Sequence, residues 1–77
     1  MTIKAKLFGV LVDYAQANEI EFSDVTTTKE LIFKVNRKFT SFENANYIIS
    51  VNHVIVRGDQ KISPDDEIAL LPPFAGG

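Results

Sequence analysis

The first residues of the chain alternate between apolar and charged side chains. Apolar residues occupy positions 3, 5 and 7, and lysines stand between them, which is the period of a strand with one buried face. Residues 19–22 alternate in the same way, with glutamates next to Ile20 and Phe22. The two runs predict an antiparallel hairpin, and residues 10–15 between them can close as a short helical turn.

A helix is predicted over residues 28–39. Its apolar positions recur every fourth residue and form one stripe: Leu31, Val35 and Phe39. Thr27 and Glu30 fit a capping box, in which the threonine hydroxyl accepts from a free backbone N–H and the glutamate reaches back to the cap residue. Cations near the C-terminal end complement the helix dipole, and we assign three residues to that role rather than to a docking patch: Lys34, Arg37 and Lys38.

Three more strands are predicted over residues 47–51, 54–56 and 67–71. Asn52 and His53 join the first two, because asparagine tolerates the left-handed backbone of a tight turn. We therefore assign His53, the only histidine, to turn chemistry, and the acidic residues 65–67 to solvated surface. One helix across one mixed sheet lets so few elements share a core. The predicted class is α+β, with the β-grasp or ubiquitin-like fold.

Alternation also assigns side chains to the two faces of the sheet. The predicted core consists of Ile3, Leu7, Ile20, Phe22, Leu31, Val35, Ile49, Val51, Ile68 and Leu70. Phe8 and Leu71 then point away from the core, and Ile55 does so if Val54 and Val56 are buried. We predict that Phe8, Ile55 and Leu71 lie together opposite the helix and bind a partner, because several apolar side chains exposed on one face mark a docking surface.

Composition narrows the possible functions. The 77 residues fit one domain, and the net charge of −2 lacks the clustered cations that nucleic-acid binding requires. The absence of cysteine excludes disulfides, thiolate metal sites and cysteine nucleophiles. No apolar stretch approaches the roughly 20 residues that span a bilayer. We therefore expect a cytoplasmic protein with neither a nucleic-acid nor a membrane partner, and no nucleophile–base pair indicates an enzyme that acts alone.

The C-terminal end differs from the rest of the chain. Proline cannot donate to a strand ladder, so Pro72 and Pro73 predict a β-grasp domain over residues 1–71 and an extended tail over residues 72–77. The chain ends with Gly76 and Gly77, whose lack of a Cβ lets the backbone enter a narrow slot. The Gly77 carboxylate is therefore the candidate reactive group. It requires activation by ATP to an acyl-adenylate, and since the chain has no phosphate-binding glycine loop, a partner must supply that activation.

Taken together, these residues resemble the small subunit of molybdopterin synthase, the MoaD-like branch of a sulfur-carrier family that includes the thiamine sulfur carrier. The resemblance covers essentially the whole chain and is carried by residues 7–9, 51–52, 65–69 and 71–77. The diproline ending is its most specific part and favours the molybdopterin branch. The chain differs at Asp66, where the family commonly has glycine, and at Val12 and Asp13, which replace an Arg-Glu pair.

The resemblance implies that an E1-like adenylating enzyme uses ATP and magnesium to activate Gly77, and that a sulfur donor converts it to a thiocarboxylate. The chain itself would bind no cofactor. The tail would then enter the large subunit of molybdopterin synthase and give sulfur to a pterin precursor for the dithiolene. The inserted tail residues would be Pro72, Pro73, Phe74, Ala75 and Gly76. The alternatives are a thiamine-type carrier, a ubiquitin-like protein modifier, and a β-grasp interaction domain with an inert tail.

Overall fold

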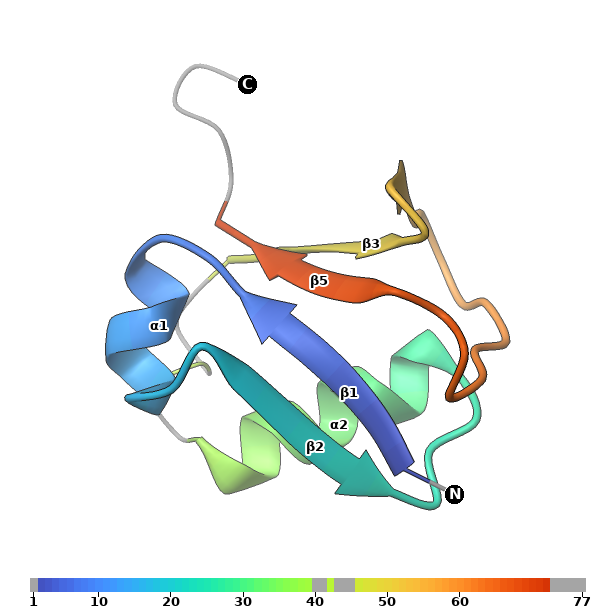
Figure 1. The fold of residues 1–77 in the computed structure, drawn as a ribbon, viewed down its shortest axis with the longest axis horizontal. Helices are drawn as coiled ribbons and strands as arrows, with labels where there is room; N and C mark the ends of the chain where they lie inside the picture. Colours follow the sequence, from blue (N-terminus) through green and yellow to red (C-terminus); the bar gives the residue numbers. More distant parts are fainter. Residues whose placement is uncertain (1, 40–41, 43–45, 73–77) are drawn as a thin grey trace.

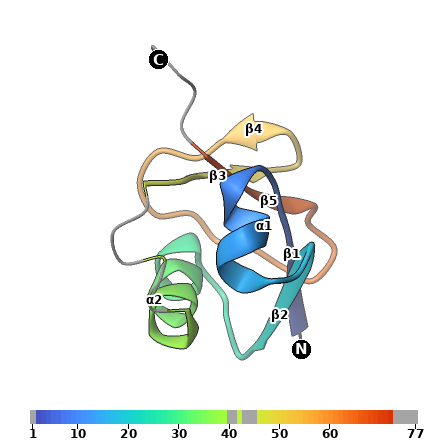
Figure 2. The same cartoon turned by 90° about the vertical axis from the view of Figure 1, so that its left-hand side faces the viewer.

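The computed structural model describes residues 2–39, 42 and 46–72 of the chain. These residues form a mixed sheet in the strand order β2-β1-β5-β3-β4, with the helix α2 on one of its faces (Figures 1 and 2). The central pair, β1 and β5, is parallel, and the other neighbouring strands are antiparallel. This is the predicted β-grasp fold. The element bounds are β1 Thr2–Leu7, α1 Val10–Ala15, β2 Glu19–Ser23, α2 Thr28–Lys38, β3 Ile48–Val51, β4 Val54–Ile55 and β5 Ile68–Leu71.

The core lies between the sheet and the helices. Every predicted core residue is buried except Phe22, which is half-buried and packs against the others. The structure adds Leu11, Val25, Phe42 and Ile62 to the core. Phe42 holds an aromatic cluster in which the Tyr14, Phe39 and Tyr47 ring centroids lie 5.8, 5.6 and 5.6 Å from its own. Such aromatic pairs stabilise a thin core beyond the area they bury.

The start of α2 differs in one detail from the predicted capping box. The Thr27 hydroxyl accepts from the Glu30 N–H at 3.2 Å, as expected. The Glu30 carboxylate, however, binds the residue before the cap, accepting from the Thr26 N–H at 2.9 Å and the Thr26 hydroxyl at 2.7 Å. The approach to the helix is extended against residues 60–62, which accounts for the change of partner. The Thr26 side-chain and backbone bonds lower the pKa of Glu30.

The loop before β5 also holds the start of α2. Asp59 Oδ1 accepts from the Lys29 N–H at 3.0 Å, which satisfies another free amide of the first turn. The Thr28 hydroxyl accepts from the Gln60 N–H at 3.0 Å. Asp59 and Gln60 therefore fix the helix to the loop before β5.

The turn between β3 and β4 has the predicted left-handed geometry, with φ of 52° at Asn52 and 69° at His53. The prediction that Val54 would be buried is wrong, since 67% of its surface is exposed. Val54 belongs to a two-residue strand at the sheet edge, away from α2 (Figure 2), where none of the described helices packs over it. Val56 is half-buried, as expected, and packs against the core.

Candidate functional site

The sheet face that points away from α2 carries a row of side chains from four strands. Lys6 on β1 pairs with Ala69 on β5, Ala69 pairs with Ser50 on β3, and Ser50 pairs with Ile55 on β4. Paired residues on adjacent strands project to the same face. Because Ala69 and Ser50 in the middle of the row are small, the sheet is hollow there.

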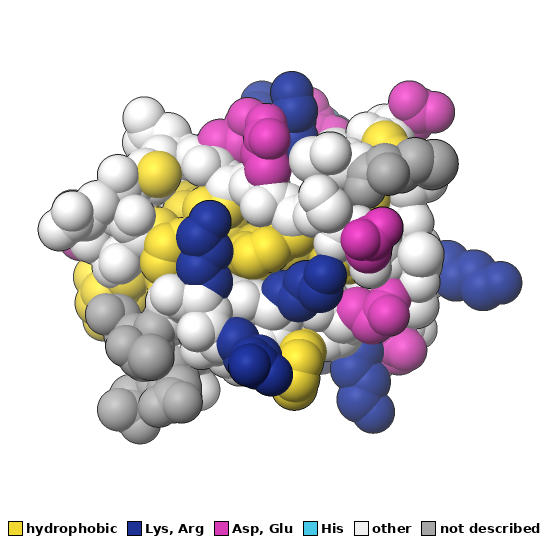
Figure 3. All heavy atoms as spheres, turned by 90° about the horizontal axis from the view of Figure 1, so that it is seen from below, with side chains coloured by type: hydrophobic (Ala, Val, Ile, Leu, Met, Phe, Trp, Pro, Cys, Tyr) yellow, Lys and Arg dark blue, Asp and Glu magenta, His cyan; other side chains and the backbone are white. Residues whose placement is uncertain are grey.

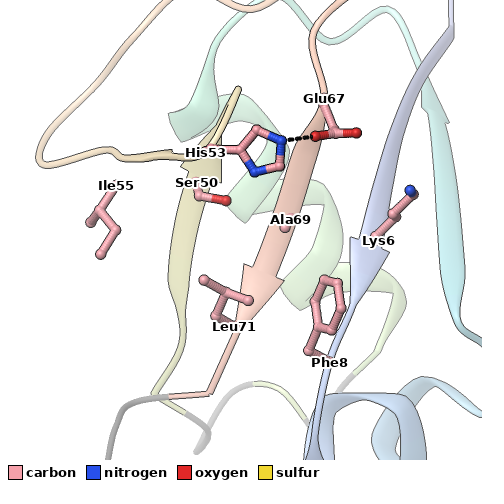
Figure 4. Close-up of a pocket in the computed structure, with 8 residues that line it drawn as sticks. All are labelled: Lys6, Phe8, Ser50, His53, Ile55, Glu67, Ala69 and Leu71. Atoms are coloured by element: carbon pink, nitrogen blue, oxygen red, sulfur yellow. Dashed lines mark ion pairs between the residues drawn. The ribbon is translucent and has the colours of Figure 1, made fainter.

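Phe8, Ile55 and Leu71 border this hollow, which we call the sheet pocket. Its lining consists of Lys6, Phe8, Ser50, His53, Ile55, Glu67, Ala69 and Leu71. Figure 4 shows Phe8 and Leu71 near each other at one end, where β1 and β5 finish, and His53 with Glu67 at the other end. Phe8 and Ile55 expose 46% and 43% of their surface, and Leu71 is half-buried. The structure thus brings the three predicted residues together, and their binding of a partner stays a prediction.

His53 has a partner that the sequence reasoning missed. Its Nε2 atom lies against Glu67 Oε2 (Figure 4), so the assignment of His53 to turn chemistry alone is wrong. Both side chains are well exposed, and an ion pair in water stabilises a fold by only about 0–1 kcal/mol. The pair therefore adds little to the stability of the fold. It forms the polar end of the sheet pocket, opposite the apolar end.

Asn52 explains why Glu67 lies beside the turn. Its side-chain oxygen accepts from the Glu67 N–H at 2.9 Å, and its side-chain amide donates to Asp66 Oδ1 at 3.0 Å. Asp66 Oδ2 also accepts from the Ser63 N–H at 2.8 Å, and these two bonds, the Ser63 bond foremost, lower the pKa of Asp66. Asp66 is half-exposed at the surface, and it also organises the loop before β5.

Gly9 determines how closely the chain after β5 packs at the start of the tail. The Phe8 N–H donates to the Leu70 carbonyl at 3.2 Å, which brings the chain after β1 next to the chain after β5. Gly9 adopts φ 59° and ψ −138°, a conformation that residues with a Cβ rarely take. A Cβ on Gly9 would lie 2.8 Å from Pro72 Cγ. Gly9 thus allows the first residue of the tail to pack directly on the backbone, a role not visible in the sequence, where Gly9 only breaks the strand pattern.

The remaining predicted tail residues, Pro73, Phe74, Ala75, Gly76 and Gly77, lie outside the described residues. Pro72 is described, and it is half-buried. Among residues 2–39, 42 and 46–72, neither helix is long and apolar enough to cross a membrane. The same part of the chain contains no group of three or more side chains placed to hold a metal ion.

Gly9→Ala is expected to destabilise the fold by more than Gly58→Ala. Both glycines have a positive φ, so each substitution carries backbone strain of about 1–3 kcal/mol. A Cβ on Gly58 meets nothing within 4 Å, whereas one on Gly9 collides with Pro72. Urea unfolding of the two variants measures the difference.

A double-mutant cycle tests the cause of that difference. Pro72→Ala should restore part of the stability lost in Gly9→Ala, with a coupling of about 0.5–3 kcal/mol, as for residues in contact. Equal losses for the two glycine variants, together with no coupling to Pro72, would show that Pro72 does not rest on Gly9.

Comparison with known proteins places this geometry in a family. The sequence profile of the ThiS family matches residues 5–77, and no curated protein sequence matches the chain. Among solved structures, the putative molybdopterin converting factor, subunit 1, from Pyrococcus furiosus has a TM-score of 0.85 and 20% identity, with 96% of this chain and 99% of that chain covered.

Two further structures have the same fold. SAMP1 from Haloferax volcanii has a TM-score of 0.82 and 18% identity over 100% of both chains. The small archaeal modifier protein 1 from Methanosarcina acetivorans has a TM-score of 0.80 and 22% identity, covering 99% of this chain and 96% of that chain. Identities this low establish a common fold only. The match of the family profile over residues 5–77 shows that the chain belongs to the ThiS family of ubiquitin-like sulfur carriers.

Proposed function

We propose that this protein carries sulfur for molybdopterin synthesis on the carboxylate of Gly77. The observation that supports the proposal best is the continuity between the sheet pocket and the tail. Leu71 lines the pocket, and the next residue, Pro72, begins the tail and lies against Gly9. A partner that covers the pocket therefore also receives the tail from a defined starting point.

The sheet pocket suits protein docking better than catalysis. Its apolar end consists of Phe8 and Leu71, and Ile55 adds a further exposed apolar side chain across β3 (Figure 4). Its polar end holds the exposed His53–Glu67 pair. An apolar centre with a polar rim is the usual arrangement of protein interfaces. We assign this surface to the E1-like adenylating enzyme and to the large synthase subunit in turn.

The chemistry at the tail would follow from the weak reactivity of a carboxylate. On the adenylating partner, which would bind ATP and magnesium, the Gly77 carboxylate attacks the α-phosphate and releases pyrophosphate. A sulfur nucleophile from the donor then displaces AMP from the acyl-adenylate and leaves a thiocarboxylate. In the large subunit, the thiocarboxylate gives its sulfur to the pterin precursor. The chain contributes the reacting terminus and its placement, and the partners contribute the catalytic groups.

The second candidate is a ubiquitin-like modifier, in which activated Gly77 would be joined to a lysine of another protein. Two of the similar structures are modifier proteins by name, SAMP1 and small archaeal modifier protein 1. The diproline ending at Pro72 and Pro73 favours the molybdopterin carrier over a thiamine-type carrier, and the mass measurement below separates it from a modifier.

Mass measurement of the intact protein tests the proposal. Incubation with a cognate adenylating enzyme, ATP, magnesium and a sulfur donor is expected to replace one C-terminal oxygen atom by sulfur. Adding the large synthase subunit with a pterin precursor should then reverse that gain and form dithiolene product. Sulfur transfer only to a thiamine precursor, or a covalent adduct on lysine, would support the respective alternatives. Failure to load under all these conditions would support the inert tail.

A further inference from the structure

A second surface lies on α2, on the opposite side of the sheet from the sheet pocket. Figure 4 shows α2 behind the sheet whose front carries the pocket. Phe33, on this helix, exposes 60% of its surface and borders two shallow hollows. Phe22, Lys34, Arg37 and Lys38 complete the first hollow, and Thr27, Lys29, Glu30, Lys34 and Asp59 complete the second. Phe33 with the cations Lys29, Lys34, Arg37 and Lys38 is called the helix surface below.

The helix surface is charged oppositely to the rest of the protein. Helix α2 holds four of the eight basic residues and one of the ten acidic residues, a net charge of +3. The rest of the chain therefore carries −5, since the total is −2. Figure 3, which views the molecule from below, shows Lys and Arg side chains gathered around exposed hydrophobic surface. Helix α2 is thus a basic element in an acidic chain, with Glu30 and Asp59 beside its cations.

The helix dipole accounts for only part of this charge. It favours cations in the last turn, which holds Arg37 and Lys38, and its effect falls off within one turn. Lys29 stands in the first turn, where the dipole disfavours a cation. Dipole complement, which the sequence suggested for Lys34, Arg37 and Lys38, therefore does not account for Lys29.

None of these cations forms an ion pair among the described residues, although the charge of Lys34 contributes to lowering the pKa of Glu30 and its Nζ donates to the Ser23 carbonyl at 2.8 Å. The ion pairs within that part of the chain are Lys4–Glu21 and His53–Glu67, and neither involves α2. Instead, the Arg37 guanidinium lies 5.6 Å from the Phe33 ring centroid, and Lys38 Nζ lies 5.7 Å from that of Phe22. Cations held over aromatic rings stay close to apolar surface, so this surface offers positive charge and an aromatic ring side by side.

We propose that the helix surface docks an acidic segment of a partner protein, one that carries an apolar side chain to cover Phe33. The carboxylates of this segment would pair with the four cations of the helix surface, and its apolar side chain would pack on the Phe33 ring. A nucleic acid fits less well, because its phosphate backbone would continue beyond the helix surface over the acidic remainder of the chain, whereas a short acidic segment would not. Since the two surfaces lie on opposite sides of the sheet, a partner bound to α2 leaves the sheet pocket accessible.

The test uses a fluorescent peptide of glutamates around a single phenylalanine, with anisotropy as the readout. Binding is expected to weaken with added salt, because screening reduces attraction between exposed charges. Two control peptides, one with lysines for the glutamates and one with alanine for the phenylalanine, should bind more weakly. No binding of the first peptide, or equal binding of all three, would overturn the proposal.

Matched variants of the full chain locate the site. Lys29→Glu should weaken peptide binding by about tenfold, the effect of about 1.4 kcal/mol, and Lys6→Glu, with the same charge change on the opposite side of the sheet, should leave it nearly unchanged. A glutamate at position 29 suits the helix dipole but lies near the Asp59 carboxylate, which accepts from the N–H of that residue. Urea unfolding of the variant therefore separates lost binding from lost structure. Phe33→Ser should also weaken peptide binding. Val54→Ser replaces another exposed apolar side chain and should bind the peptide like the parent protein.

Binding of other ligands, and self-association of the chain, test whether the partner is an acidic protein segment. Tighter binding to a single-stranded oligonucleotide or to anionic lipid vesicles than to the peptide would overturn the assignment to an acidic protein segment. Salt-sensitive self-association in sedimentation experiments, lost in Lys29→Glu, would overturn it in favour of a second copy of this chain. Equal effects of the α2 variants and their matched controls would show that the helix surface is not the site.

Discussion

Deleting Gly77 is expected to reduce thiocarboxylate formation by at least about a hundredfold. One residue of extended chain spans about 3.3–3.6 Å, so the deletion withdraws the carboxylate by that distance from the adenylating centre. A misplacement of about 1 Å already costs about a hundredfold in rate at an active site. The loss is measured by intact mass after incubation with the adenylating enzyme, ATP, magnesium and a sulfur donor.

Two controls separate a lost reactive group from a damaged fold. Adding one alanine after Gly77 keeps both terminal glycines but moves the carboxylate beyond them, and we expect it to be equally inactive. Both variants should unfold at the same urea concentration as the parent protein, because the sheet and helices end before the tail. Sulfur loading of the shortened chain at the parent rate would show that Gly77 is not the carrier residue.

The second large effect is expected at the sheet pocket. Phe8→Asp or Leu71→Asp should weaken binding to the adenylating enzyme and to the large synthase subunit by at least about thirtyfold, the effect of roughly 2 kcal/mol that marks central interface residues. A carboxylate at the exposed position 8 or the half-buried position 71 reaches water in the free protein and would be buried without a partner in the complex. Isothermal titration with each partner measures the loss.

Val54→Asp provides the matched control for these substitutions. Val54 is apolar and more exposed than Phe8 or Ile55, but it lines no part of the sheet pocket. It should therefore bind both partners like the parent protein. Binding that survives Phe8→Asp and Leu71→Asp, or that falls equally in Val54→Asp, would remove the docking role from the pocket. Thermal unfolding of each variant distinguishes lost binding from lost structure.

Local patterns were enough to predict the elements of this fold. Alternation from residue 3 to residue 7 assigned three side chains to the core and Phe8 to the outside, because successive strand residues point to opposite faces. The spacing of Leu31 and Val35 defined the buried stripe of α2, and the prolines after Leu71 marked the end of β5. These features depend on neighbours within a few residues, so the sequence displays them directly.

Residues that join the core from irregular segments followed no such pattern. Leu11, Val25, Phe42 and Ile62 are buried, yet none belongs to a run with the period of a strand or of the main helix. Val54 shows the reverse, since its position in an alternating run predicted burial. The two-residue edge strand lies beyond the cover of α2 (Figure 2), and that depends on the arrangement of whole elements.

The sequence by itself determined the strands, the main helix, the outward-facing apolar residues and the candidate reactive terminus of this protein. Only the tertiary structure decided which distant residues meet. Parallel pairing of β1 with β5 brings Gly9 against Pro72, and antiparallel pairing of β3 with β5 brings His53 to Glu67. Strand pairing joins residues far apart in the chain through backbone hydrogen bonds that any side chain permits. The choice among pairings therefore depends on how the whole core packs, which no local pattern specifies.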